Sequence, residues 1–272
     1  MFMSCQRRCV LVVLGLSTIA ALETLPAGPS SLAAAQGTSA KIWVGRYQEI
    51  EDYLRTGECL TVEKLGSETS TAFRCVLRPG GPVARMAWKP LPPGIYRGFF
   101  SSYKTEIAAY ELDRLLQLDM VPPTVARQLQ GNTGAAILWV ENIVTWKGDA
   151  PPGEANRRDW DKQLARMAMF GGLTGDQDRN LANVLRDGDW NLILIDHTAA
   201  FRLATTIPRP LSRIDGDYWD RVLALTRQEL DARLRPWLDE NQITAILDRR
   251  ERMKAEVARL IAEKGEAAVV LR

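Results

Sequence analysis

The 272-residue sequence contains a single histidine, His197, and this scarcity excludes several kinds of active site. Zinc sites that need two or three histidines are ruled out, and no cluster of cysteines replaces them. A Ser-His-Asp hydrolase would have to use His197, yet the G-x-S-x-G motif of many hydrolases is absent. Any catalytic chemistry therefore depends mainly on carboxylates, Lys, Arg and Asn.

The body of the chain has neither a strong net charge nor a long apolar run. The net charge of +2 at pH 7 gives no support to a nucleic-acid binder that depends on bulk charge. After the first 35 residues no run of 18 apolar residues occurs, so no membrane span is expected in the mature chain. With 46% hydrophobic and 25% charged residues, the composition suits one large domain or two lobes.

The first 35 residues have the pattern of a secretory signal. Two arginines precede the apolar segment CVLVVLGLSTIAAL, and three alanines stand before Gln36. We therefore predict a signal peptide over residues 1–35 and export to the periplasm or the extracellular space. The alternative is an uncleaved membrane anchor through residues 9–22.

Cysteine is also scarce, with four residues in the whole chain. Cys5 and Cys9 belong to the predicted signal peptide. Cys59 and Cys75 remain, on two predicted strands around a polar turn. In an oxidising compartment such a pair is expected to form a disulfide, and the alternative is two reduced, buried thiols.

Hydrophobic periodicity and turn residues divide the chain into a β-rich part and a helical part. In the first part we predict a short helix capped by Gly57, three strands before residue 90, a Pro/Gly-marked loop over 91–100, a strong helix over 103–118, and two strands around a Gly131-Asn132 turn.

In the second part we predict a helix over 159–173, two short strands before Asp196, and only helices from Tyr218 onward. Two of these helices begin with capping boxes, Thr226 with Glu229 and Asp239 with Gln242. The predicted organisation is an N-terminal extension (36–57), an N-terminal lobe (58–142) and a C-terminal lobe (143–272). A cleft between two lobes is a common place for a ligand.

Two residues of the N-terminal lobe suit phosphate binding. Lys89 ends the third strand, and the following helix offers Glu106. A strand Lys held by a helix Glu would fix an ammonium group in the cleft, where it can neutralise phosphate oxygens. Taken singly, each residue has a simpler explanation: Lys89 could be a solvated strand end, and Glu106 could be an exposed helix residue.

The segment GDQDRNLANVLRDGDWNLILIDHTAAF (175–201) carries the stronger signal. Asn183 and Asp196 offer two oxygen ligands of the kind that Mg²⁺ takes from proteins, and Asp178 suits a base that orients an attacking hydroxyl. The alternative is a hairpin with a polar lead-in, in which Asp and Asn serve turns. That alternative accounts for Asp187 and Asp189, but it does not require an acid directly after the apolar run LILI.

The pattern D-R-x-x-x-N, followed by an apolar strand and I-D, resembles the catalytic and metal-binding motifs of the atypical protein-kinase-like fold. It is most similar to the secretory-pathway kinases of the four-jointed and Golgi casein kinase type, and HipA-like and phosphatidylinositol-kinase-like bacterial proteins share the scheme. The resemblance covers residues 58–202. It implies an α+β, bilobal fold with a β-rich N-terminal lobe that holds one long helix, and a mainly helical C-terminal lobe.

The resemblance also implies roles for individual residues, with ATP and Mg²⁺ or Mn²⁺ as cofactors. Asp178 corresponds to the catalytic base, Asn183 and Asp196 to the metal ligands, and Lys89 with Glu106 to the phosphate-binding pair. The connection between the lobes would offer backbone groups to adenine, and a loop from Gly66 to Ser70 would lie over the phosphates. The connecting residues are Leu138, Trp139, Val140 and Glu141.

Three positions depart from the family pattern. Asn180 stands where secretory kinases carry His, His197-Thr198 follows Asp196 in place of Phe-Gly, and the phosphate loop has only Gly66. Asp176 is a second acid that could rival or help Asp178.

We expect an exported kinase-like phosphotransferase that moves the γ-phosphate of ATP to a hydroxyl of a protein, a glycan or a small molecule. The alternatives are a pseudokinase that acts as a nucleotide-binding or scaffolding module, and AMP transfer on the same fold.

Overall fold

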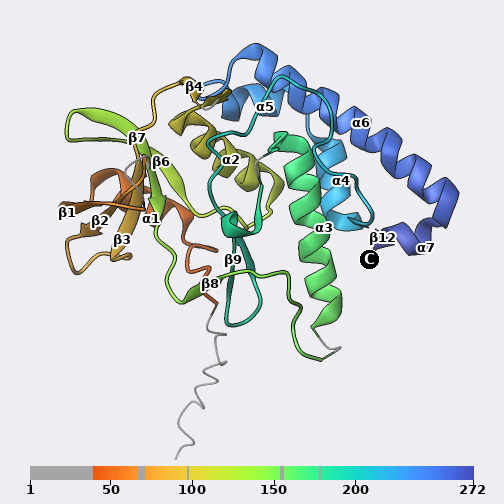
Figure 1. Cartoon of the computed structure of the whole chain (residues 1–272), viewed down its shortest axis with the longest axis horizontal. Coiled ribbons are helices and arrows are strands. Elements are labelled where there is room, and N and C mark those ends of the chain that lie inside the picture. Colours follow the sequence, from red (N-terminus) through yellow and green to blue (C-terminus); the bar gives the residue numbers. More distant parts are fainter. Residues whose placement is uncertain (1–38, 67–70, 97, 154–155, 178) are drawn as a thin grey trace, which may run out of the picture. The chain divides into compact units, whose positions relative to one another are not determined.

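The computed structural model describes most of the chain after the predicted signal peptide (Figure 1). The described residues are 39–66, 71–96, 98–153, 156–177 and 179–272. They belong to one compact unit. The predicted signal peptide, most of the predicted phosphate loop and Asp178 lie outside the described residues. Within the described ranges, no helix combines the length and the hydropathy that crossing a membrane requires.

A five-stranded antiparallel sheet forms the centre of the N-terminal lobe, with strand order β1-β2-β3-β7-β6. Its strands are β1 (Cys59–Lys64), β2 (Phe73–Leu77), β3 (Arg85–Lys89), β6 (Thr124–Leu129) and β7 (Asn132–Leu138). The predicted turn between the last two strands is wrong by one residue, because Asn132 pairs with Leu129. Gln130 and Gly131 form the turn with φ of 51° and 78°, as a type I′ hairpin turn demands.

The disulfide predicted between Cys59 and Cys75 is present and joins β1 to β2, with 5.8 Å between the two Cα atoms.

Two helices, α1 (Tyr47–Thr56) and α2 (Tyr103–Leu116), pack against β6 and β7. Arg127 of β6 holds the end of α1, since its guanidinium donates to the carbonyl oxygens of Leu54 and Gly57 at 2.8 and 2.6 Å. Gly57 ends the helix as predicted, but its φ is −56°, so a left-handed cap is not the reason for a glycine. A Cβ atom there would lie 2.8 Å from the carbonyl oxygen of Tyr53.

The segment predicted as a loop over 91–100 instead contains a short hairpin, β4 (Gly94–Tyr96) paired with β5 (Phe99–Ser101). The prediction is wrong because the Pro and Gly residues bound the strands rather than exclude them. Two prolines precede β4, and Gly98 follows it with φ of 81°. At the base of the hairpin, the Tyr103 amide donates to the Leu91 carbonyl at 2.7 Å.

The C-terminal lobe is mainly helical, as predicted. Its helices are α3 (Arg157–Thr174), the 3₁₀ turn η1 (Leu181–Asn183), α4 (Gly216–Ala224), α5 (Arg227–Leu234), α6 (Glu240–Lys264) and α7 (Glu266–Val269). Both predicted capping boxes are present, at the starts of α5 and α6.

Two small sheets complete this lobe. A three-stranded sheet has the order β10-β9-β8 and consists of β8 (Ile143–Thr145), β9 (Val184–Asp187) and β10 (Leu192–Leu194), of which β8 was not predicted. The expectation that only helices follow Tyr218 is wrong, because β12 (Val270–Leu271) pairs in parallel with β11 (Ile214–Asp215).

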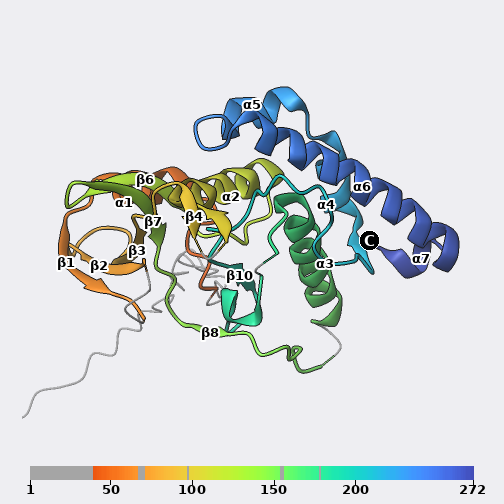
Figure 2. The ribbon, with the colours of Figure 1, turned by 45° about the horizontal axis from the view of Figure 1, so that its top comes forward.

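Helix α2 lies between the two lobes. The five-stranded sheet stands on one side of it and helices α3 to α6 on the other (Figures 1 and 2). Its Ala108, Leu112 and Leu116 belong to the hydrophobic core of the C-terminal lobe, whereas Ile107 packs with residues of β7. Side chains that leave the first turn of α2 toward β3 therefore face the junction of the two lobes. The α+β, bilobal architecture expected from the resemblance is confirmed.

Candidate functional site

Lys89 is the centre of a charged cluster at the junction of the lobes. Its Nζ lies 2.6 Å from Glu106 Oε1 and 2.9 Å from Asp196 Oδ1. The ion pair predicted between Lys89 and Glu106 is therefore present. Only 13% of the Lys89 side chain and 3% of the Glu106 side chain are exposed, so the pair is largely withdrawn from water.

The backbone around Lys89 is held by close strand contact. Lys89 pairs with Ala135 of β7 in the antiparallel register. A Cβ atom on the neighbouring Gly134 would lie 2.7 Å from the Lys89 carbonyl oxygen, which is closer than real side chains approach. Glycine at position 134 thus lets β7 come near enough to fix the end of β3.

Burial and mutual charge together set the pKa values of the cluster. Burial alone would lower the pKa of Lys89, but the charges of Glu106 and Asp196 outweigh it and raise that pKa above its usual range. Burial raises the pKa of Glu106 against the opposing charge of Lys89. Partial burial acts the same way on Asp196, yet the charge of Lys89 and its hydrogen bond hold the pKa of that carboxyl well below its usual range. Lys89 is therefore a cation at neutral pH.

Asp196 leaves strand β10 in an uncommon backbone conformation. Its φ of 59° lies in the left-handed region, which Asp tolerates better than most residues. The Thr198 hydroxyl donates to Asp196 Oδ1 at 2.9 Å, so Lys89 and Thr198 share one carboxylate oxygen. The side chain is 43% exposed. Asp196 thus combines a fixed orientation with access to the pocket.

His197 joins Glu106 to the loop that precedes η1. Its backbone N–H donates to Glu106 Oε2 at 3.0 Å, and its ring nitrogen Nδ1 lies 2.8 Å from Arg179 Nη2. Because a guanidinium can only donate, Nδ1 is the acceptor and carries no proton. Burial, followed by the charge of Arg179, holds the pKa of His197 well below its usual value, in agreement with a neutral ring.

Arg179 ties the loop that precedes η1 to the end of β10. Its Nη2 donates to Asp176 Oδ2 at 2.7 Å, and its Nη1 donates to the carbonyl oxygens of Asn183, at 3.0 Å, and Ile195. Both Arg179 and Asp176 are buried. Asp176, the second acid of the loop, is therefore an ion-pair partner of Arg179. The adjacent Asn180 caps η1, since its Oδ1 accepts from the Ala182 amide at 2.9 Å.

Asp187 is the last residue of β9, and Asp189 lies in the turn that leads to β10. The Asp187 side chain bonds to this turn, in agreement with the turn interpretation. Asp187 Oδ1 accepts from the amides of Asp189 and Asn191 at 3.0 and 2.8 Å. Its Oδ2 also accepts from the Ala40 amide at 2.9 Å, a long-range contact that the turn pattern does not predict.

A pocket of about 300 Å³ opens beside Lys89 between the two lobes. Seven of the predicted residues line it: Lys89, Glu106, Leu138, Trp139, Val140, Asn183 and Asp196. Its other walls are mostly apolar and come from both lobes: Leu65, Ala72, Ala87, Val121, Pro122, Thr124, Ile137, Ile143, Leu185, Leu194, Ile195 and His197.

Two predicted residues do not line this pocket. Glu141 turns to Arg85, whose Nε donates to it at 2.8 Å. Gly66 has a positive φ of 70° and follows Leu65, which does reach the pocket. The predicted base, Asp178, lies outside the described residues.

The oxygen atoms available in this pocket suit a divalent cation that is also bound by phosphate oxygens and waters. Among the described residues, no group of three or more His, Cys, Asp or Glu side chains could hold a metal ion. Asn183 and Asp196 supply oxygen atoms at one pocket, and Mg²⁺ commonly binds through one or two protein ligands together with phosphate oxygens and waters. The bonds from Lys89 and Thr198 both go to Oδ1 of Asp196, so Oδ2 is the oxygen suited to a cation.

Sequence reasoning missed three contributors to this site: Arg179, His197 and Thr198. The only available signal was their position beside Asp178 and Asp196. His197 and Thr198 stand where the family pattern has Phe-Gly. In the structure, the His197 amide donates to Glu106 and the Thr198 hydroxyl donates to Asp196.

The fold and the site can be compared with known proteins. No protein-family model and no curated protein sequence matches the chain. The crystal structure of the Golgi casein kinase with Mn/ADP bound is similar, with a TM-score of 0.63 and 15% identity over 83% of this chain and 78% of that chain. The structure of hydra Fam20 with sugar has a TM-score of 0.60 and 15% identity over 82% and 91% of the two chains. The resemblance to the secretory-pathway kinases is confirmed at the level of the fold: this chain has the atypical protein-kinase-like fold.

Proposed function

We propose that the protein is a kinase-like phosphotransferase that moves the γ-phosphate of ATP to a hydroxyl acceptor with the help of Mg²⁺ or Mn²⁺. The observation that carries the proposal is the ammonium of Lys89, held between Glu106 and Asp196 beside a pocket with apolar walls. Catalysis of phosphoryl transfer depends mainly on positioning and charge neutralisation, and a fixed ammonium next to a metal-ligating carboxylate supplies both. The Mn/ADP complex of the Golgi casein kinase supports the choice of cofactors.

Each residue of the cluster has a role in the proposed reaction. Lys89 neutralises oxygens of the bound phosphates, and Glu106 keeps it in place. Asn183 and Asp196 hold the divalent cation, which when bound offsets charge on the β- and γ-phosphate oxygens. Asp178 accepts the proton of the acceptor hydroxyl while the hydroxyl oxygen bonds to the γ-phosphorus and the bond to ADP breaks.

We assign the base of the nucleotide to the part of the pocket that Trp139 and Val140 line. The main chain there can face adenine, and the proposed contact of Glu141 is likewise through its main chain. Ala87 and Leu185 supply apolar walls from the two lobes, as expected for a flat aromatic ligand. The loop from Gly66 to Ser70 is proposed to cover the phosphates, since Leu65 and Ala72 flank it and line the same pocket.

We further propose that residues 1–35 direct export. The disulfide between Cys59 and Cys75 supports this, because disulfides persist mainly in oxidising compartments. Fusion of residues 1–35 to a reporter that is active only outside the cytoplasm tests the proposal. A silent reporter on a stably expressed fusion contradicts it.

Ligand-dependent thermal unfolding of the purified protein tests nucleotide binding. ATP or ADP at about 100 times the dissociation constant, with Mg²⁺ or Mn²⁺, should add roughly 2.7 kcal/mol to the free energy of unfolding. The gain should disappear when the metal is chelated. If neither nucleotide nor metal shifts the unfolding transition, the proposed function is wrong.

The substitution Asp178→Asn separates turnover from binding. It should reduce phosphate transfer from labelled ATP by about 10²- to 10⁴-fold, the usual contribution of a general base, and leave nucleotide binding intact. Asp189→Asn, at an exposed turn of the same segment, is the matched control and should retain activity.

The reaction products distinguish the alternatives. Mass spectrometry that finds adenylate rather than phosphate on the product indicates AMP transfer. Nucleotide binding without transfer by the unmodified protein indicates a pseudokinase.

A further inference from the structure

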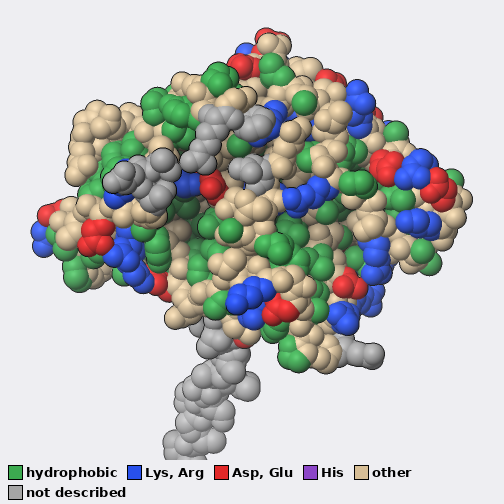
Figure 3. Space-filling view, viewed as in Figure 1, with side chains coloured by type: hydrophobic (Ala, Val, Ile, Leu, Met, Phe, Trp, Pro, Cys, Tyr) green, Lys and Arg blue, Asp and Glu red, His purple; other side chains and the backbone are tan. Residues whose placement is uncertain are grey.

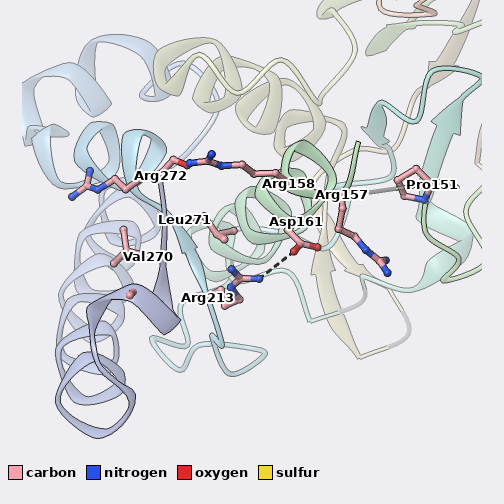
Figure 4. A pocket seen from close by; sticks show the side chains of 10 residues that line it. Pro151, Arg157, Arg158, Asp161, Arg213, Val270, Leu271 and Arg272 are labelled. Carbon is pink, nitrogen blue, oxygen red and sulfur yellow. Dashed lines mark hydrogen bonds and ion pairs between the residues drawn. The ribbon is translucent and has the colours of Figure 1, made fainter. Parts of the chain in front are cut away.

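A second pocket, of about 820 Å³, lies in the C-terminal lobe at the beginning of α3 (Figure 4). It shares no lining residue with the pocket beside Lys89. Ten described residues line it: four are arginines, Arg157, Arg158, Arg213 and Arg272, and one, Asp161, is an acid. The pocket is therefore strongly basic, although the chain as a whole is close to neutral.

The arginines of this pocket share very little negative charge. Arg213 pairs with Asp161 at 3.1 Å. Arg158 donates to the main-chain oxygen of Arg272, the last residue of this chain, and that oxygen belongs to a carboxylate. Arg157 has no ion pair within the described ranges. One side-chain carboxylate and one terminal carboxylate thus serve four guanidinium groups at hydrogen-bonding distance.

The remaining arginine is only loosely neutralised. Arg272 lies 3.8 Å from Asp220 and 3.9 Å from Glu266, beyond hydrogen-bonding distance, and its side chain is 61% exposed. Side chains of Lys and Arg gather on the surface between the beginning of α3 and α7 (Figure 3). These groups are open to solvent and can reach a ligand without rearrangement of the core.

The start of α3 itself contradicts an ordinary helix preference. Arg157 and Arg158 occupy the first two helical positions, where the positive end of the helix dipole disfavours cations. Asp159 is the only acidic residue of the first turn, and the Asn156 side chain makes no capping bond. Residues that break a local rule are more frequent at functional sites. An anion in the pocket would relieve the repulsion among the guanidinium groups and satisfy the helix end.

We propose that this pocket binds a small ligand that carries two or more phosphate groups. The planar fork of arginine matches phosphate oxygens, and each phosphate monoester carries up to two negative charges. The arginines are spread across the pocket rather than gathered at one point (Figure 4), so a single phosphate would leave part of the positive charge without a partner. The proposal does not depend on the proposed function of the Lys89 pocket.

Calorimetric titration of the full protein with inorganic tripolyphosphate tests the proposal. The double variant Arg157→Gln/Arg158→Gln should bind the probe at least about tenfold more weakly than the unmodified protein, because two charge-assisted contacts are lost. The matched control is Arg252→Gln/Lys254→Gln, which removes the same charge from the exposed side of α6 and should bind within about twofold of the unmodified protein. Circular dichroism verifies that both variants are folded.

Three outcomes overturn the proposal. The first is equal affinity of the pocket variant and the unmodified protein. The second is an equal loss in the control variant, which would indicate attraction by bulk charge alone. The third is inorganic phosphate binding as tightly as tripolyphosphate, which would contradict a site built for more than one phosphate group.

Discussion

The two pockets arrange their charges in opposite ways. Beside Lys89, one ammonium lies between two carboxylates at 2.6 and 2.9 Å, and the Lys89–Glu106 pair is almost entirely buried. At the start of α3, four exposed arginines face one side-chain carboxylate and one terminal carboxylate within hydrogen-bonding distance. The first arrangement is balanced inside the protein, whereas the second carries an excess of positive charge.

This difference follows from the cost of burying charge. A buried ion must be paired within the protein, because water no longer stabilises it. An exposed ion can remain unpaired at low cost, since solvent and salt screen it. The Lys89 cluster is thus a preorganised part of the fold, and the arginine pocket is prepared to receive counter-charge from a ligand.

The largest effect is expected from removing the cation of the balanced cluster. Lys89→Met leaves Glu106 buried and unpaired, which should lower the free energy of unfolding by about 3–5 kcal/mol. Chemical denaturation at pH 7 measures this loss. Addition of Glu106→Gln to the same chain should recover part of it, because the uncompensated charge is gone. A Lys89→Met variant as stable as the unmodified protein would contradict the assigned importance of the pair.

Asp113 is a buried carboxylate that, unlike Glu106 and Asp196, forms no hydrogen bond with a cation among the described residues. Asp113 of α2 accepts hydrogen bonds from the backbone amides of Asp119, Met120 and Val121 at 3.1, 2.9 and 2.8 Å. These bonds lower its pKa less than burial raises it, and the resulting pKa is about 7. Glu106 and Asp196, by contrast, share the charge of Lys89.

The raised pKa of Asp113 makes its stability contribution depend on pH. The folded state binds the proton more tightly than the unfolded state, so the contribution is complete below about pH 4 and is lost as the pH rises toward 7. Between pH 5 and 7, the unmodified protein should therefore lose stability relative to Asp113→Asn by about 1.4 kcal/mol per pH unit. Urea denaturation of both proteins across this range measures the difference.

The exposed Asp52→Asn variant, which removes one carboxylate from the surface of α1, is the matched control. Parallel pH profiles for Asp113→Asn and the unmodified protein would show that burial does not control this carboxyl group.

The smallest effect, of opposite sign, is expected in the unbalanced pocket. Without ligand, Arg157→Gln should stabilise the protein by about 0.3–1 kcal/mol, because it removes a cation from the positive end of α3. Denaturation at low ionic strength measures the gain, which should shrink at high salt. Arg252→Gln is the control and should leave stability unchanged. Destabilisation by Arg157→Gln would mean that its charge is already compensated in the free protein.

Some contacts of the Lys89 cluster could be predicted from the sequence, and others could not. The contact between Lys89 and Glu106 was predicted because a strand end and the helix that follows it lie near each other in this type of fold. Asp196 was identified by an acid placed directly after a buried strand. The roles of Arg179 and His197 could not be predicted, because they depend on the meeting of a loop with a strand end.

The arginine pocket could not be predicted from the sequence either. Arg157 and Arg158, Arg213 and Arg272 are separated by more than 50 positions along the chain, and no short motif links them. The hairpin over 94–101 was missed for a different reason, since its Pro and Gly residues indicate a turn but not the pairing of such short strands.

The sequence by itself determined the local features of this protein. The apolar positions of α2, the capping boxes of α5 and α6, and the polar residues at strand ends follow from periodicity and from hydrogen-bonding chemistry within a few residues. Tertiary structure alone decided which charges are neutralised. Lys89 became a paired cation because the packing of α2 and β10 brings two carboxylates to it, and the arginines of the second pocket remained in excess because the elements that meet there bring too few acids.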